Sequence, residues 1–151
     1  MANTQAMTTS FKTEILTGTH NFGVAPIRAA TTADTFKAAL YLASATMNAT
    51  STAYTTTGEV TGTNYTAGGI AVTNATVPAN SGTTAYWTPS ASLTYTTVTL
   101  STAFDAVLIY NNTQANKAVS VHTFGSQTVT AGTFTLTMPT NDASTGLIRI
   151  A

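Results

Sequence analysis

Apolar side chains alternate with polar ones, mostly threonine, in several short runs of the sequence. In residues 34–44, for example, Phe36, Ala38, Leu40 and Leu42 fall at every second position. Because successive side chains of a β-strand point to opposite faces, this spacing predicts a strand with one face buried. Threonine suits the solvent side of such strands, since it is β-branched and carries a hydroxyl group without adding charge.

Further short segments carry strand patterns. The run at 104–110 is almost continuously apolar, which predicts a central strand that is covered on both faces. The alternation in residues 92–100 slips at Thr96-Thr97, and Ala131-Gly132 is expected to form a tight hairpin turn. The other predicted strands are residues 70–77, 83–88, 117–124, 127–130, 133–138 and 146–151.

Turn-forming residues separate these strands at regular intervals. Asn80-Ser81-Gly82 and the Asn-rich segment 111–116 are turn signals, and four glycines in residues 58–69 indicate a long connection or a broken strand. Eight or nine short strands spaced in this way predict an all-β fold, a single-domain β-sandwich or jelly-roll-like structure over residues 10–151. A chain of 151 residues has room for one such domain.

The N-terminal region has no strand pattern. Residues 1–9 are polar and aperiodic, and we expect them to form an extended arm. One short helix is predicted after the arm, with Ser10 as its cap and Gly18 as its end. Three apolar side chains would share one side of this helix: Phe11, Ile15 and Leu16.

Charge is scarce and balanced in this chain. Charged residues make up 7% of the sequence, against about 25% in typical domains, and five Lys and Arg balance five Asp and Glu. Nucleic-acid binding requires a basic stripe that five scattered cations cannot supply, so we expect no nucleic-acid partner. The sequence contains 37 threonines. A neutral surface rich in threonine favours packing against other proteins over remaining a free monomer.

Membrane and disulfide chemistry are not indicated either. No apolar run reaches the roughly 18 residues of a membrane helix, and Met1–Ser10 lacks an apolar signal core, so we expect neither membrane insertion nor Sec export. The chain contains no cysteine, which excludes disulfides and thiolate metal sites. This composition suits a protein that folds in a reducing cytoplasm.

A catalytic triad can be drawn from the sequence by residue type only. It would combine Ser120 or Ser126 with His122 and Asp105. No nucleophile-elbow sequence supports it, and His122 lies within a predicted strand, where packing or a hydrogen bond is the favoured role.

Two other arrangements of polar residues, a cation site and a crosslink, are possible by residue type. Asn141-Asp142 with Asp105 would suit a weak Ca²⁺ site, although a solvated turn is favoured. Lys37, Asn111 and Asp105 are the residue types of an isopeptide crosslink, but Lys37 falls on the polar side of its strand. We therefore expect no catalytic residue, no metal and no cofactor, and we do not expect an enzyme.

The aromatic pair Tyr86-Trp87 is the sharpest aromatic feature of the sequence. An exposed Trp can bind a sugar ring, but adjacent strand residues point to opposite faces, which favours one ring in the core and the other in an interface. The candidate interface residues are Phe11, Ile15, Leu16, Tyr86, Trp87 and Tyr95, with core packing as the alternative for the helix residues.

Three segments, in order, resemble the small all-β structural proteins of tailed bacteriophages. They are MANTQAMTTSFKTEILTGTHNF, DTFKAALYLASATMNATSTAYTTTGEVTGTNYTAGG and VLIYNNTQANKAVSVHTFGSQTVTAGTFTLTMPTNDASTGLIRIA. Together they cover about two thirds of the chain, and the match is most similar to the head decoration, or cement, proteins. No catalytic residue is carried across by this resemblance.

The resemblance implies a jelly-roll-like protein on the outer surface of the capsid, made in the cytoplasm of the host bacterium. Its partners would be the major capsid protein and copies of itself, commonly in a homotrimer. The alternative is a tail- or fibre-associated virion protein with a receptor- or glycan-binding role. A glycan hydrolase is disfavoured, because it needs paired carboxylates across a cleft and only five acids are spread over the chain.

Overall fold

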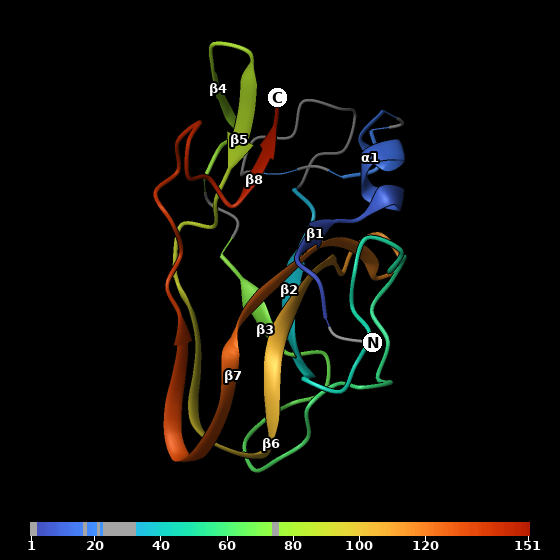
Figure 1. The fold of residues 1–151 in the computed structure, drawn as a ribbon. Helices are drawn as coiled ribbons and strands as arrows, with labels where there is room; N and C mark the ends of the chain where they lie inside the picture. The colour runs from blue at the N-terminus through green and yellow to red at the C-terminus, as the bar shows by residue number, and fades with distance from the viewer. Residues whose placement is uncertain (1–2, 17, 21, 23–32, 74–75) are drawn as a thin grey trace.

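The computed structural model describes residues 3–16, 18–20, 22, 33–73 and 76–151. These residues confirm a mostly β fold with one short helix, in which every strand pair is antiparallel. One sheet has the order β1-β7-β6-β2-β3 and a second has the order β4-β5-β8 (Figure 1). The elements are β1 (Ala6–Met7), α1 (Thr9–Leu16), β2 (Phe36–Leu42), β3 (Ile70–Val72), β4 (Ala79–Ser81), β5 (Thr84–Trp87), β6 (Leu93–Asn111), β7 (Lys117–Leu136) and β8 (Ile148–Ile150).

Strands β6 and β7 form one long antiparallel ribbon that is joined by the predicted Asn-rich turn. The hairpin expected at Ala131-Gly132 is wrong: β7 runs through this point, and Ala131, at a φ of 46°, lies in a bulge. Its N–H donates to Thr99 Oγ1 at 3.0 Å. The slip predicted at Thr96-Thr97 is confirmed, because Thr97 has a φ of 54° and the register shifts there.

The ribbon bends sharply near its middle. We call residues 104–111 with 117–127 the proximal half, and residues 93–100 with 129–136 the distal half. The register shifts on both sides of Phe104, and Figure 1 shows both strands turning back at the lower end of the molecule. The distal half thereby covers a face of the first sheet: Tyr95 donates a hydrogen bond to the carbonyl oxygen of Ala38 at 2.8 Å, and the Phe104 and Phe134 rings meet edge to face at 5.0 Å.

Strand β2 is buried on both faces, although the alternation predicted one. Phe36, Ala38 and Leu40 belong to the main core beneath the distal half, whereas Ala39 and Tyr41 belong to a second core on the opposite face. The segment after β2 covers that second face and includes the buried Met47 and the partly buried Tyr54. For residues 104–110 the prediction of burial on both faces is confirmed.

A buried carboxylate holds the glycine-rich connection 58–69 against the sheet. Glu59 is 6% exposed and accepts hydrogen bonds from Tyr54 Oη at 2.7 Å, Tyr65 Oη at 2.8 Å and the Gly68 N–H at 2.7 Å. Burial, and less strongly the Glu59 charge, raises the pKa of Tyr65, so its hydroxyl remains a donor. Gly69 has a φ of 70° and no room for a Cβ, because the Ala38 carbonyl lies against it.

The helix is confirmed, but its cap is Thr8 rather than Ser10. Thr8 Oγ1 accepts the Phe11 N–H at 3.3 Å, and Gly18 ends the helical segment at a φ of 66°. The extended arm expected over residues 1–9 is packed, from Asn3 onward, on its own domain. Strand β1 pairs with β7, and Asn3 bonds to the Leu42 carbonyl. These residues bury backbone groups locally and do not extend from the domain.

The turn predicted at Asn80-Ser81-Gly82 forms slightly later in the second sheet: Asn80 and Ser81 end β4, and Gly82, at a φ of 56°, lies in the turn to β5. The strand expected at 70–77 ends at Val72, and residues 74–75 lie outside the described part. The last predicted strand is confirmed as β8, which pairs with β5.

Candidate interaction surface

A pocket of about 140 Å³ opens between α1 and the three-stranded sheet. Strand alternation explains the sheet side of its wall: Trp87 pairs with Ile148 and Ala85 pairs with Ile150, so these side chains share one face. The pocket is almost entirely apolar, and its lining includes Phe11, Ile15, Phe22, Trp87, Ile148 and Ile150.

Aromatic rings pack closely against one another in this wall. Phe22 lies 4.6 Å from Phe36 in a stacked arrangement and 4.7 Å from Trp87, measured between ring centroids. The indole N–H of Trp87 donates to the Thr76 carbonyl at 2.8 Å, so the buried donor is satisfied. On the helix side, the rings of Phe11 and His20 meet edge to face at 4.8 Å.

We use the word rim for two exposed apolar residues, Ile150 in the pocket lining and Val77 next to the lining residue Pro78 in the sequence. Val77 is 57% exposed and Ile150 is 44% exposed, and they are the exposed large hydrophobic residues in the described part of the chain. Ile150 lines the pocket, and Val77 precedes Pro78, which also lines it. A pocket of this size with an apolar rim can receive one side chain from another molecule.

The structure shows where the six predicted interface residues lie. Phe11, Trp87 and Tyr95 are buried in the core of the single chain, at 1%, 2% and 2% exposure. Ile15 packs partly buried against that core, and the Leu16 side chain lies outside the described part. Tyr86 is half-buried on the face opposite Trp87, as expected for neighbours in a strand.

Four of the six predicted residues nevertheless line the pocket: Phe11, Ile15, Tyr86 and Trp87. Tyr95 lies elsewhere, in the distal half of the ribbon, where its hydroxyl donates to the Ala38 carbonyl. Sequence reasoning missed the rim residues Val77 and Ile150. The alternation of Ile148 and Ile150 around Arg149 indicated one apolar face on the last strand and was the available signal.

Two members of the hypothetical triad do meet. Ser120 Oγ and His122 Nε2 lie 2.8 Å apart on neighbouring same-face positions of β7. Burial lowers the pKa of His122 to about 4, so the ring is neutral near pH 7. Asp105 instead bonds to the Asn3 amide, and within the described residues no carboxylate hydrogen-bonds to His122. The pair therefore has the hydrogen-bonding role that the sequence favoured.

The other acidic side chains of the described residues are tied into local structure. Asp34 accepts hydrogen bonds from Asn111 at 2.9 Å and Gln114 at 3.0 Å, which closes the β6–β7 turn. Asp142 accepts bonds from Ser144 and Thr145, and these bonds lower its pKa to about 2.

These contacts separate the groups of the two other arrangements that the sequence permitted. Asn111 directs its amide to Asp34 and Asp105 directs its carboxylate to Asn3, so the isopeptide set is not assembled. Asp142 is held within its own turn rather than with Asp105. In the described part of the chain no three His, Cys, Asp or Glu residues gather as metal ligands.

Comparisons of the chain with protein-family models, with curated proteins and with solved structures gave no match. None of the helices in the described ranges has the length and apolar character needed to cross a bilayer.

Proposed function

We propose that this chain is a structural protein of a tailed-phage virion, a decoration protein that binds the outer capsid surface and stabilises contacts between major capsid subunits. The resemblance of three ordered segments to phage structural proteins supports the proposal. We also infer that the bent ribbon and the sheet beneath it are a variant of the sandwich or jelly-roll arrangement that the resemblance implies.

The observation that carries the proposal is the contrast between the acidic side chains, which are hydrogen-bonded within the domain, and the apolar side chains at the pocket, which are exposed. Glu59, Asp34, Asp105 and Asp142 are all occupied by structural hydrogen bonds. The apolar groups at the rim of the α1–β8 pocket, in contrast, face solvent. A protein built in this way acts by contact rather than by proton transfer.

The mechanism follows from interface physics. Burial of apolar area gives about 25 cal/mol per Å², so an anchored side chain in the pocket and the covered rim supply a modest affinity per site. Many copies on a regular lattice multiply that contribution, and each copy that bridges two subunits gains from effective concentration. The scarcity of charge removes the desolvation cost that charged groups would add at such contacts.

Copy number tests the proposal most directly. Quantitative mass spectrometry of purified virions is expected to find hundreds of copies per particle. A dozen or so copies would indicate the tail- or fibre-associated role instead. Absence from mature particles would refute a virion role altogether.

The docking surface is tested by charge insertion at the rim. Ile150→Asp and Val77→Asp are expected to weaken binding to heads that lack this chain by tenfold or more, because each places a carboxylate against an apolar contact. Thr83→Asp, in the exposed turn between β4 and β5, adds the same charge away from the pocket and is the matched control. Equal binding by all three variants would remove the pocket from the docking surface.

A further inference from the structure

The outer edge of β7 is uncovered over most of its length. Strand β6 bonds to one edge from Lys117 to Leu136, whereas β1 pairs with the other edge at Ser120 and Val121. No further strand of the described residues pairs there. Figure 1 shows the distal half of β7 at the outer margin of the ribbon. Unpaired backbone groups on such an edge are a template for another strand.

Backbone alternation identifies which groups are available. The Met138 N–H points toward β6, since it donates to Ser92 Oγ at 3.2 Å. Neighbouring residues of a strand direct their N–H and C=O groups to opposite sides, so those of Thr133, Thr135 and Thr137 point away from β6. All three threonines are exposed.

Protection against edge pairing is weak along this segment. Natural edges carry charged side chains, inward charges or proline. Between Lys117 and Asp142 the chain has no Asp, Glu, Lys or Arg, and Pro139 lies beyond the three threonines. The bulge at Ala131 precedes the segment and leaves residues 133–136 as a regular stretch at the end of β7, with Thr137 and Met138 directly after it.

A second copy of the chain suits this edge better than an unrelated strand. Two identical antiparallel strands are related by a two-fold axis, so each residue meets the same short sequence running the other way. With the axis at Thr135, that residue faces itself, and Thr133 faces Thr137 of the second copy. Each hydrogen-bonded pair exchanges two bonds, which gives up to about six new backbone bonds. Cross-strand Thr–Thr pairs are themselves favourable.

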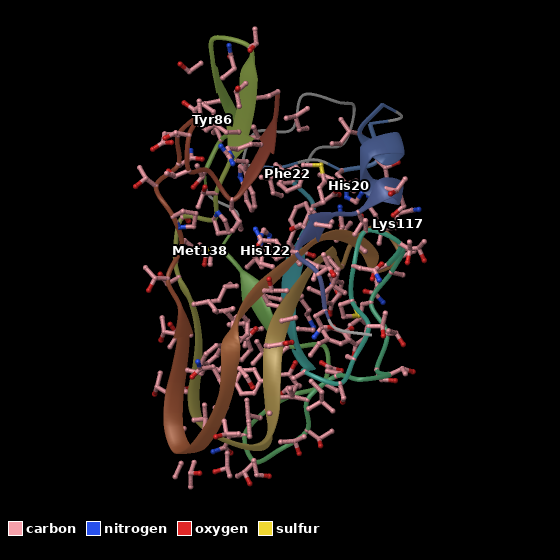
Figure 2. The ribbon with its side chains drawn as sticks, in the orientation of Figure 1. His20, Phe22, Tyr86, Lys117, His122 and Met138 are labelled. Carbon is pink, nitrogen blue, oxygen red and sulfur yellow. The ribbon has the colours of Figure 1, made fainter. Side chains whose placement is uncertain are left out.

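The inner face gains apolar contacts in the same register. Phe134, Leu136 and Met138 are partly buried against the core, and Phe134 would lie directly opposite Leu136 of the second copy. Behind the edge, a mostly apolar pocket of about 110 Å³ is lined by Leu136, Met138 and Leu147 among others. Figure 2 shows Met138 and His122 on the same side of the molecule, where this pocket opens.

We propose that the outer edge of the chain from Thr133, in β7, to Met138, two residues after β7 ends, pairs antiparallel with the same edge of a second copy, about a two-fold axis at Thr135. This self-contact is separate from the α1–β8 pocket and goes beyond the proposed docking role. It also differs from the trimer that the phage resemblance implies, because a trimer has no two-fold contact of this kind.

The two-fold geometry permits a charge-swap experiment on the full chain by analytical ultracentrifugation. The unmodified protein is expected to form dimers. Thr135→Lys and Thr135→Asp are each expected to weaken self-association at least tenfold, since each variant opposes its own charge. An equimolar mixture of the two variants is expected to regain dimers as Lys–Asp heterodimers, which native mass spectrometry resolves. Thr94→Lys is the matched control, because Thr94 is exposed and pairs with Thr135 on the already bonded side of the ribbon.

Circular dichroism and urea melts of each variant check that the fold is retained. If Thr135→Lys itself proves unfolded, the double variants Thr133→Asp/Thr137→Asp and Thr133→Lys/Thr137→Lys supply the same swap one pair away from the axis, because residue 133 faces residue 137 of the second copy. A monomeric unmodified protein at several hundred micromolar would overturn the proposal. Dimers or trimers that Thr135→Lys leaves intact, or variants that fail to recombine when mixed, would overturn it as well.

Discussion

Replacement of Glu59 tests whether the acidic residues of this protein are structural. The Glu59 carboxylate accepts three hydrogen bonds, at 2.7, 2.8 and 2.7 Å, from Tyr54, Tyr65 and the Gly68 N–H. Glu59→Ala removes all three acceptors and leaves space where the carboxylate was. Glu59→Gln preserves the size of the side chain and one acceptor oxygen.

The expected loss follows from which donors can reach water. The Gly68 N–H is buried and Tyr65 is largely buried, so each loses its partner at a cost of about 1–3 kcal/mol. Tyr54 is half-exposed and can bond to water, so it adds little. We therefore expect Glu59→Ala to cost about 3–5 kcal/mol of unfolding free energy, a large part of the 5–15 kcal/mol typical of a domain. Glu59→Gln should cost about 1–2 kcal/mol, because loss of charge-assisted bonds is offset by relief of a buried charge.

Urea unfolding followed by tryptophan fluorescence measures these differences, since Trp87 is buried in the core. Tyr54→Phe is the control, because it removes only the hydrogen bond of the half-exposed donor to Glu59. It should lower the unfolding free energy by less than about 1 kcal/mol. The expected order of loss is Glu59→Ala, then Glu59→Gln, then Tyr54→Phe. A loss below about 1 kcal/mol for Glu59→Ala would refute the structural assignment and leave this carboxylate free for chemistry.

Three further predictions concern the core, the pH response and a bulge. Trp87→Ala should lower the unfolding free energy by about 3–5 kcal/mol in urea melts, and Tyr86→Ala should lower it by less than about 1 kcal/mol. Equal losses would contradict the inward placement of Trp87, which is 2% exposed. Burial lowers the pKa of His122 to about 4, so its neutral form stabilises the fold fully above about pH 6.5, and about 1–3 kcal/mol of that stability is lost as the pH falls toward 4. His122→Gln should flatten the stability profile in this window, and an unchanged slope would assign the titration to another group. Ala131→Gly should raise stability by about 0.5 kcal/mol, because Ala131 has a φ of 46°; a lower melting temperature would argue against strain at the bulge.

Strand formation was predictable where the pattern is local. The apolar run at 104–110, the Asn-rich turn that follows it and the slip at Thr96-Thr97 were all predicted. Each depends on residues that are neighbours in sequence, such as β-branched side chains or turn formers. The hairpin at Ala131-Gly132 was wrong because a glycine after a residue with positive φ suits a bulge as well as a turn. Which of the two forms depends on the partner strand.

The candidate interaction surface was predicted less completely. Large apolar and aromatic residues were identified as interface candidates, but exposure is not encoded by residue type. Trp87 and Tyr95 differ in no local feature from interface aromatics, yet the core covers both. Val77 and Ile150 are ordinary strand-formers whose exposure depends on where the second sheet lies.

The alternation of apolar residues with threonine was sufficient to predict a mostly β fold, and the scarcity of charge is the reason that we expect no nucleic-acid partner. Only the tertiary structure decided that β2 is buried on both faces, that the β6–β7 ribbon folds over its own sheet and that the outer edge of β7 remains unpaired over most of its length. The physical reason is that periodicity specifies two faces of a strand but not what lies against each. That choice is made by contacts between distant parts of the chain, such as the hydrogen bond from Tyr95 to the Ala38 carbonyl.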